Sequence, residues 1–154
     1  VVNDRADVAA AAAADGVHLG QHDLPVEHAR RVVGALALVG GSAHDLGEAG
    51  RLVAAGCDYA GVGRFARSDT KSDATEAGPD FVRAFTDAHP GLPHLVIGGV
   101  GPENIDEVIA AGGRGVAVCA AACAAADPSE VVAGLRLTLQ QAVADDLEAA
   151  GDAG

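Results

Sequence analysis

The chain has 154 residues, of which 22 are acidic and 10 are lysine or arginine, so its formal net charge is −12 at pH 7. This length is enough for one domain with a hydrophobic core, and so acidic a surface argues against nucleic acid or an anionic membrane as a partner. Because no apolar stretch of about 18 residues occurs and the three cysteines form no CxxC pair, we expect no membrane-spanning helix, and free thiols in a reducing cytoplasm.

Short apolar runs alternate along the chain with alanine-rich stretches. Such runs are typical of strands that are buried on both faces of a parallel sheet. In chain order, the predicted strands are Val1–Val2, Gly16–Leu19, Ala35–Gly40, Tyr59–Val62, His94–Ile97 and Gly115–Cys119. The predicted helices, several of which begin at a proline suited to a first helical turn, are Arg5–Ala14, Val26–Val33, Leu46–Ala55, Pro79–Ala88, Pro102–Ala111 and Pro128–Ala149.

Three phrases share a pattern in which a helix ends, a glycine follows and a strand begins: AAADGVHLG, VAAGCDYAGVG and IAAGGRGVAV. This repeat of βα units predicts an α/β fold, either a barrel or an open sheet. Polar residues follow almost every predicted strand, which favours a (β/α)8 TIM barrel because its active face is the ring of loops at the carboxyl ends of the strands. The chain is short for a complete barrel, so we expect an incomplete one over residues 1–140, followed at 141–154 by a helix end and a frayed tail.

Two aspartates stand directly after neighbouring predicted strands. Asp4 follows the first strand and Asp23 follows the second, so both carboxylates are expected above the same end of the barrel. Oxygen ligands from adjacent loops suit Mg²⁺, which keeps several waters and binds substrate phosphates. The alternatives are that Asp4, with Asn3, begins the following helix and that Asp23 is an ordinary loop residue before Pro25.

Two later loops are candidates for binding phosphate. The segment 63–78, GRFARSDTKSDATEAG, is long and polar, and Lys71 within it can meet a phosphate as a point charge, unless it is simply a solvated lysine. The segment 97–104, IGGVGPEN, ends a strand with Gly98 and Gly99 just before a helix. Glycines let the backbone approach an anion, although the same pair also makes an ordinary tight turn.

The histidines give weaker signals. His18 and His22 form an HxxxH pattern, which binds zinc when both lie on one helix face, but here it runs from a strand into a loop and the shared face is lost. His44 follows the third predicted strand, where a hydrogen-bonding role is favoured over general base catalysis. No Ser-His-Asp or Cys-His arrangement is evident, so we expect no catalytic acid or base.

Four phrases resemble the thiamine phosphate synthase family in the same order and spacing: VVNDRADVAAAAAADGVHLGQHDLP, GGSAHDLGEAGRLVAAGCDYAGVG, DTKSDA and VIGGVGPENIDEVIAAGGRGVAV. The resemblance runs from residue 1 to about residue 140. It implies a (β/α)8 barrel that joins hydroxymethylpyrimidine diphosphate to a thiazole phosphate, giving thiamine phosphate and diphosphate. It also implies that diphosphate leaves first and the thiazole nitrogen captures a pyrimidine-methyl cation, chemistry that needs a metal and hydrogen-bond donors more than a general base.

The same motifs imply which residues bind these small-molecule substrates. Asp4 and Asp23 would bind Mg²⁺, and Lys71 would contact the diphosphate. Asn3 would hold the diphosphate or pyrimidine region, and Ser42 would hydrogen-bond the pyrimidine. The groups implied around the thiazole and its phosphate are Ser68, Thr70, Gly78, Gly99, Val118, Cys119 and Ala120.

The chain also departs from the family's pattern. Arg64 stands where a proline is usual, Ser68 where a threonine is usual and Ala120 where a serine is usual. The family's first two strands, with a Gln-x-Arg-x-Lys motif that grips the diphosphate, are absent. We therefore expect the last six βα units, inactive until a missing N-terminal segment or a homo-oligomer closes the barrel. The alternatives are a thiazole tautomerase, which Thr70, Lys71 and the paired aspartates disfavour, and a non-catalytic phosphate-binding remnant.

Overall fold

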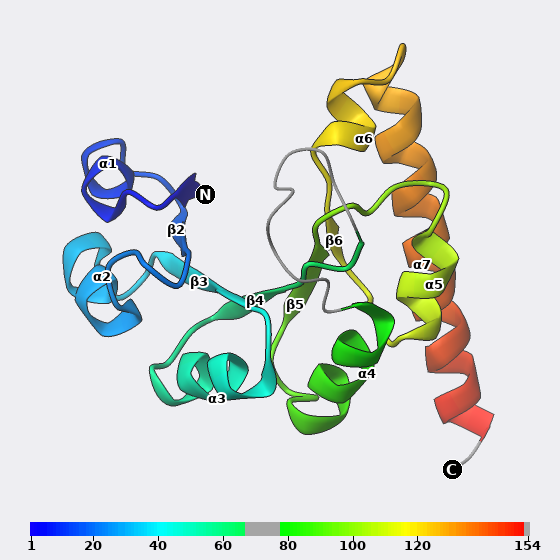
Figure 1. The fold of residues 1–154 in the computed structure, drawn as a ribbon, viewed down its shortest axis with the longest axis horizontal. Coiled ribbons are helices and arrows are strands. Elements are labelled where there is room, and N and C mark those ends of the chain that lie inside the picture. Colours follow the sequence, from blue (N-terminus) through cyan, green and yellow to red (C-terminus); the bar gives the residue numbers. More distant parts are fainter. Residues whose placement is uncertain (67–77, 153–154) are drawn as a thin grey trace.

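The computed structural model describes residues 1–66 and 78–152, in which strands and helices alternate (Figure 1). The strands are β1 (Val2–Asn3), β2 (Gly16–Leu19), β3 (Leu38–Ala43), β4 (Tyr59–Val62), β5 (His94–Ile97) and β6 (Val116–Ala117). The helices are α1 (Ala6–Ala11), α2 (Val26–Val33), α3 (Leu46–Ala54), α4 (Gly78–Ala88), α5 (Ile105–Ala110), α6 (Ala120–Cys123) and α7 (Pro128–Asp152). In the described ranges, no helix combines the length and the apolar composition that crossing a membrane requires.

The six strands form one parallel sheet in chain order, from β1 at one edge to β6 at the other. After each strand, a connecting segment brings the chain back to the opposite edge of the sheet, where the next strand begins. A parallel sheet requires this kind of crossover connection. The sheet curls, and α1 to α4 lie along its outer side (Figure 1). The predicted α/β fold with a parallel sheet is therefore confirmed, in the form of a curled half-barrel.

Several elements are shorter than predicted or shifted by a few residues at their ends, among them β1, β6, α1 and α5, and the clearest differences concern β3 and α6. The apolar run predicts a strand over Ala35–Gly40, but β3 begins at Leu38, because Leu38 is the first residue in register with β2, opposite Gly16. Leu36 lies outside the sheet with its side chain exposed. The sequence predicts no helix over Ala120–Cys123, where the structure has α6 as one short turn after β6.

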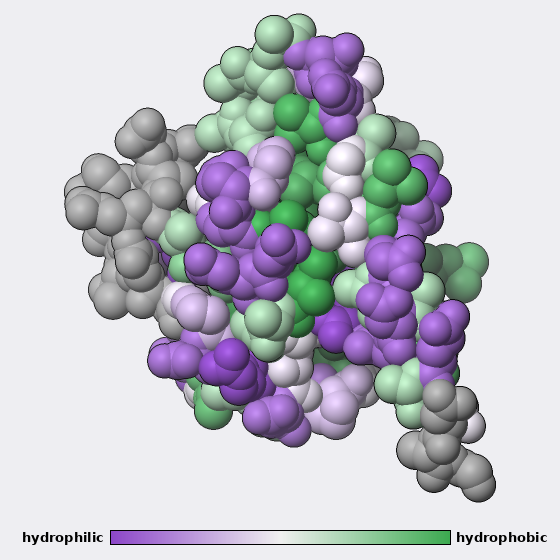
Figure 2. Space-filling view, turned by 90° about the vertical axis from the view of Figure 1, so that its right-hand side faces the viewer, coloured by the Kyte–Doolittle hydropathy of each residue, from purple (hydrophilic) through white to green (hydrophobic). Residues whose placement is uncertain are grey.

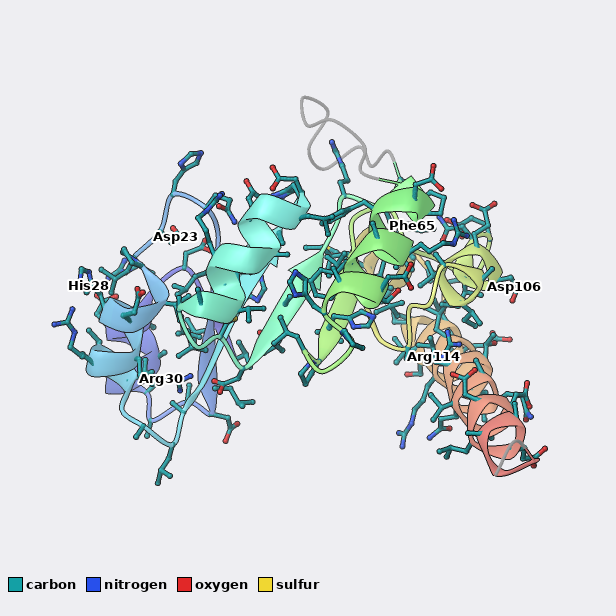
Figure 3. All side chains as sticks on the ribbon, turned by 90° about the horizontal axis from the view of Figure 1, so that it is seen from below. Asp23, His28, Arg30, Phe65, Asp106 and Arg114 are labelled. Atoms are coloured by element: carbon teal, nitrogen blue, oxygen red, sulfur yellow. The ribbon has the colours of Figure 1, made fainter. Side chains whose placement is uncertain are left out.

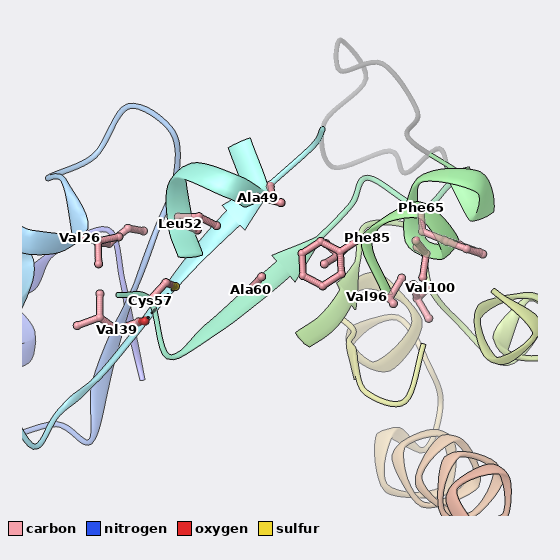
Figure 4. Close-up of a cluster of buried hydrophobic side chains, with 14 of the residues drawn as sticks. Val26, Val39, Ala49, Leu52, Cys57, Ala60, Phe65, Phe85, Val96 and Val100 are labelled. Atoms are coloured by element: carbon pink, nitrogen blue, oxygen red, sulfur yellow. Dashed lines mark hydrogen bonds between the residues drawn. The ribbon is translucent and has the colours of Figure 1, made fainter. Parts of the chain in front are cut away.

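Alternation along the strands gives the sheet two different faces. Val17 of β2 pairs with Val39 of β3 on the face that packs against the helices, and both side chains are fully buried. The next pair in register, His18 and Gly40, belongs to the opposite, concave face. Figure 4 shows the cluster buried on the helix side, which includes Val26, Val39, Leu52, Ala60, Phe85 and Val96. Each large apolar side chain there contributes roughly 1.5–3 kcal/mol, so this side holds the sheet and helices together.

Gly40 and Gly41 lie inside β3 because neighbouring side chains occupy the space on both faces. A Cβ atom on Gly40 would come within 2.1 Å of the Tyr59 ring, and one on Gly41 within 2.4 Å of the Leu52 side chain. Neither contact is sterically allowed. The two glycines therefore leave room for an aromatic ring on the concave face and for a core leucine on the helix face.

Arg30 joins the end of α2 to the starts of β3 and β4. Its Nη2 atom lies 2.6 Å from Oδ2 of Asp58, and its Nη1 atom donates to the carbonyl of Ala37. The same Asp58 oxygen accepts the N–H of Val39 at 2.6 Å. Burial works to raise the pKa of Asp58, but the hydrogen bonds from Arg30 and Val39 outweigh it, so the pKa lies below its usual value.

The β6 end of the sheet is covered by α7. Arg114 forms a two-point ion pair with Asp146 of this helix, with Nε 2.6 Å from Oδ2 and Nη2 3.0 Å from Oδ1. Leu135 is buried, whereas Leu137 and Leu147 are 67% and 70% exposed. Figure 2 shows this side of the molecule, on which apolar atoms form a stripe flanked by polar side chains. A hollow of about 480 Å³ lies here, lined mainly by residues of α7, β6 and the end of the preceding loop.

Replacing Asp58 tests the bridge at the amino ends of the strands. Asp58→Ala removes the acceptor shared by Arg30 and the Val39 N–H, so we expect the free energy of unfolding to fall by about 1–3 kcal/mol. Because the pKa of Asp58 is lowered in the folded state, the difference from wild type should shrink as the pH falls from about 4 through that lowered pKa.

Urea unfolding followed by circular dichroism at several pH values gives both quantities. The matched control is Asp80→Ala, which removes an exposed carboxylate paired with Arg83 at 3.2 Å. Equal effects of the two substitutions, or an Asp58→Ala effect independent of pH, would contradict the assignment.

Candidate functional site

The polar residues that follow the strands gather at one edge of the sheet. All six strands are parallel, so their carboxyl ends lie at the same edge. Asn3 is the last residue of β1, Ser42 lies near the end of β3, and Gly99 follows β5. Figure 3 shows Asp23, which follows β2, at the opposite end of α2 from Arg30. The candidate binding residues thus lie at the carboxyl edge of the sheet, and the stabilising contacts of Arg30 lie at the amino edge.

Asp4 has an unusual backbone conformation. Its φ angle is 65°, in the left-handed region that residues other than glycine seldom adopt. Its N–H donates to the carbonyl of His18 at 2.8 Å, which fixes the residue against β2. The first residue before α1 is Arg5, and no side chain caps that helix. Asp4 and Asn3 therefore do not serve as the helix start that was the alternative to metal binding.

Asp23 closes the loop after β2. Its Oδ2 atom accepts the N–H of Gly20 at 2.6 Å, and the side chain is half-buried. Burial lowers the pKa of His18, and the charges of Asp4 and Asp23 act in the opposite direction. Asp4, whose N–H is bonded to the carbonyl of His18, and Asp23, in the loop after β2, thus both stand at the carboxyl end of β2.

His18 also connects the second, third and fourth strands. Its Nε2 atom lies 3.0 Å from Oγ of Ser42, and its Nδ1 atom lies 3.1 Å from the hydroxyl of Tyr59. The carbonyl of Ser42 accepts a hydrogen bond from the side-chain amide of Gln21. The sequence analysis missed Tyr59 and the role of His18, since the contact depends on strand register and no local pattern signals it.

The other two histidines discussed above do not join this group. His22 is exposed on the loop after β2, so His18 and His22 share no face and the HxxxH pattern makes no zinc site. His44 stands at the start of α3, where its Nδ1 atom lies 2.9 Å from the Glu48 carboxylate. The hydrogen bond expected of His44 is thus made to Glu48 in the first turn of the following helix, α3.

Backbone hydrogen bonds join the ends of β4 and β5. The N–H groups of Phe65 and Ala66 donate to the carbonyls of Ile97 and Gly98, each at 3.0 Å. Gly98 and Gly99 both have positive φ angles, 85° and 69°. This turn is one that only glycine adopts without strain, so the pair has a conformational reason as well as the proposed phosphate-binding one.

Side chains lock the turn after β5 on both sides. Asn104 donates from Nδ2 to the carbonyl of Gly99 at 2.8 Å. Arg64, only 7% exposed, packs so closely that a Cβ on Gly98 would lie 2.7 Å from its Cγ. The carbonyl of Arg64 accepts the N–H of Gly78 at 3.3 Å. Gly78 and Gly99, both implied around the thiazole phosphate, therefore flank the same pair of strand ends.

The remaining predicted residues lie after β6 or outside the described part of the chain. Val118, Cys119 and Ala120 follow β6 directly and lead into α6, at the carboxyl edge of the sheet. Ser68, Thr70 and Lys71 fall in 67–77, outside the described residues. The three cysteines are free, with Cys57 buried and the other two exposed.

The aspartates suit one class of metal ion. Among residues 1–66 and 78–152, no three His, Cys, Asp or Glu side chains come together as a metal site. Mg²⁺ does not require such a cage, since it is held by one or two carboxylates together with waters and substrate phosphates. Asp4 and Asp23, two carboxylates in adjacent loops at the carboxyl edge, match that donor set.

Comparison with known proteins gives consistent matches. A family model described as thiamine monophosphate synthase matches residues 1–122. The thiamine-phosphate synthase of Saccharopolyspora erythraea is 48% identical over 141 residues, which cover 90% of this chain and 63% of that protein. The thiamine biosynthesis bifunctional protein ThiM/ThiE of Symbiobacterium thermophilum is 50% identical over 129 residues, which cover 83% of this chain but 27% of that protein.

A solved structure agrees with the sequence matches. The thiamine phosphate pyrophosphorylase from Pyrococcus furiosus superposes with a TM-score of 0.83 at 33% identity, over 92% of this chain and 67% of that one. The chain therefore spans from about a quarter to two thirds of the length of the proteins that it matches here.

The backbone conformation of Asp4 can be tested by comparing the stability of glycine and alanine variants. At φ 65° a glycine is less strained than an alanine, so Asp4→Gly should be more stable than Asp4→Ala by about 1 kcal/mol. In a helix the order reverses, and Asp7→Gly in α1 should be less stable than Asp7→Ala. Thermal unfolding of the four variants decides the matter, and the same order at both positions would show that Asp4 does not hold this conformation in solution.

Proposed function

This chain belongs to the thiamine monophosphate synthase family, and on that premise we propose that it forms part of an enzyme that joins hydroxymethylpyrimidine diphosphate to a thiazole phosphate. The products would be thiamine phosphate and diphosphate, by transfer of an alkyl group. The observation that carries the proposal lies at the carboxyl edge of the sheet, where the N–H of Asp4 donates to the carbonyl of His18 and Nε2 of His18 lies 3.0 Å from Oγ of Ser42, with Asp23 in the next loop. In barrels of βα units this edge is where chemistry takes place.

The metal in this proposal is Mg²⁺. Asp4 and Asp23 would hold it, and the fit rests on two half-exposed or exposed carboxylates in adjacent loops at the carboxyl edge of the sheet. When bound, Mg²⁺ neutralises charge on a leaving diphosphate. The left-handed backbone of Asp4 would serve to turn its carboxylate toward the metal, which would give the strained conformation a function.

The chain's own residues would bind the two substrates. Asn3, at the end of β1, and Ser42, on the concave face of β3, would hold the pyrimidine diphosphate. Lys71 would meet the diphosphate as a point charge. The residues assigned to the thiazole and its phosphate are Ser68, Thr70, Gly78, Gly99, Val118, Cys119 and Ala120. The left-handed turn at Gly99, held by Asn104, supports backbone contact with an anion.

We also infer that the half-barrel belongs to a complete (β/α)8 barrel. Leu38 and Leu95 are exposed on the concave face, 47% and 36% respectively, where a closed barrel would bury them. In the described part of the chain, β1 and β6 are the edge strands of the sheet, each paired with another strand on one side only. The protein that contains this chain would act in the cytoplasm on small molecules, and further strands of the same protein, or another copy of it, would cover the two edges.

The proposal is tested with the complete protein, the two substrates and Mg²⁺, by measuring thiamine phosphate with chromatography. Formation should depend on Mg²⁺, and Asp23→Asn should lower the rate by roughly 10²-fold or more, the size of effect that losing one preorganised charge contact produces. Asp87→Asn, an exposed carboxylate near the end of α4 at the opposite edge, is the matched control and should keep wild-type activity.

Absence of thiamine phosphate would contradict the synthase assignment. In that case, isomerisation of a thiazole phosphate by the same preparation would indicate a tautomerase. Binding of phosphate compounds with no turnover would indicate a non-catalytic module.

Lys71 provides a separate prediction about the diphosphate. Lys71→Ala should reduce kcat/KM for the pyrimidine diphosphate by roughly 10- to 100-fold, as expected for the loss of a hydrogen bond between charged groups. Arg83→Ala, which removes an exposed cation on α4, is the control. Steady-state kinetics with each substrate varied in turn measure the effect, and an unchanged kcat/KM would remove Lys71 from the site.

A further inference from the structure

His18 is the centre of a short hydrogen-bonded chain on the concave face. A hydroxyl group stands at each of its ring nitrogens: Tyr59 at Nδ1, 3.1 Å away, and Ser42 at Nε2, 3.0 Å away. A neutral imidazole carries one proton, so one nitrogen donates and the other accepts. The chain of three side chains therefore has a direction, and this direction decides whether Ser42 has its own proton free for a ligand.

The chemistry of the two hydroxyls favours one direction. A phenol, with a pKa near 10, is the stronger acid and hence the better donor, whereas an aliphatic hydroxyl oxygen is the better acceptor. Burial raises the pKa of Tyr59 further, which keeps its proton in place. Tyr59 then donates to Nδ1 of His18, and Nε2–H of His18 donates to Oγ of Ser42. One lone pair of Ser42 is occupied, and its O–H is left to donate elsewhere.

Packing holds both rings in the positions that this chain needs. The Tyr59 ring lies over Gly40, where a Cβ would come within 2.1 Å of it. The His18 ring lies over Gly61, where a Cβ would be 3.0 Å from Cε1. The two ring centroids are 5.5 Å apart. The two glycines therefore leave the space that the rings of Tyr59 and His18 occupy on the concave face.

The geometry points to Tyr59 and His18 as positioning residues that orient the Ser42 hydroxyl as a hydrogen-bond donor to a ring nitrogen of the bound pyrimidine. This inference rests on the proposed function, which supplies the pyrimidine. Ring nitrogens of a pyrimidine are acceptors, so they require a donor, and a neutral donor binds the ring without placing a full positive charge beside it. Tyr59 would act on substrate only through His18 and Ser42.

A double-mutant cycle in the complete protein tests this relay. Tyr59→Phe keeps the ring and removes the phenolic O–H, and Ser42→Ala removes the group through which Tyr59 acts. We expect Tyr59→Phe to raise KM for the pyrimidine diphosphate by roughly three- to tenfold, with less than about twofold change in KM for the thiazole phosphate. In the Ser42→Ala background, Tyr59→Phe should change neither constant by more than about twofold, because the relay has lost its end.

Thr86→Val, which deletes a hydroxyl bonded to the Arg83 carbonyl on α4, is the matched control and should leave both constants at wild-type values. A merely structural role of Tyr59 would give the same KM increase in both backgrounds, and that additivity would overturn the relay. If the wild-type protein makes no thiamine phosphate at all, the proposed function itself fails. This outcome is distinct from a failure of the relay, in which the wild-type protein is active and the two substitutions are additive.

A second measurement does not depend on activity. Nitrogen-15 NMR of the labelled wild-type protein reports which ring nitrogen of His18 carries the proton, with His18→Gln used to assign the signal. We expect the Nε2–H tautomer. Observation of the Nδ1–H tautomer would reverse the direction of the chain, leave Ser42 without a free proton and overturn the inference, whatever the kinetics.

Discussion

The common direction of the six strands is the constraint on which the rest of this structure depends. Each strand of a parallel sheet ends at the same edge, and each connection must return to the other edge before the next strand begins. Residues that follow β1, β2, β3 and β5 therefore lie along the same edge of the sheet although helical segments separate them in the sequence. At the opposite, amino edge, the contacts of Arg30 and Asp58 stabilise the packing of α2 against two strands.

The division of the sheet into two faces adds a second level of organisation. The helix face is filled by valine, leucine and phenylalanine side chains that are almost completely buried. The concave face carries His18, Ser42 and Tyr59, whose polar atoms satisfy one another. Hydrogen bonding within this group explains how polar side chains are tolerated on a sheet, because a polar group withdrawn from water needs a partner.

Backbone conformation supplies the third level. At the carboxyl edge, Asp4, Gly98 and Gly99 adopt left-handed conformations, and each is fixed by a contact from a neighbouring element: a β2 carbonyl for Asp4, Arg64 for Gly98 and Asn104 for Gly99. For Asp4 this conformation is unfavourable in isolation and persists where surrounding structure determines it, whereas glycine adopts it without strain. Left-handed residues such as Gly56 and Gly112 also follow helices at the amino edge, so at the carboxyl edge these conformations fix the turns but do not by themselves mark a site.

The sequence by itself determined the alternation of strands and helices and the family. These features follow from local signals: apolar runs, glycines after helices, and motifs of adjacent residues. Strands β2, β4 and β5 match their predicted bounds because their apolar residues coincide with the paired ones. Only the tertiary structure decided the start of β3, the partners of His18 and the reason for Gly40. Those depend on which residues stand opposite one another across strands, and register is a property of the assembled sheet that no single strand's sequence contains.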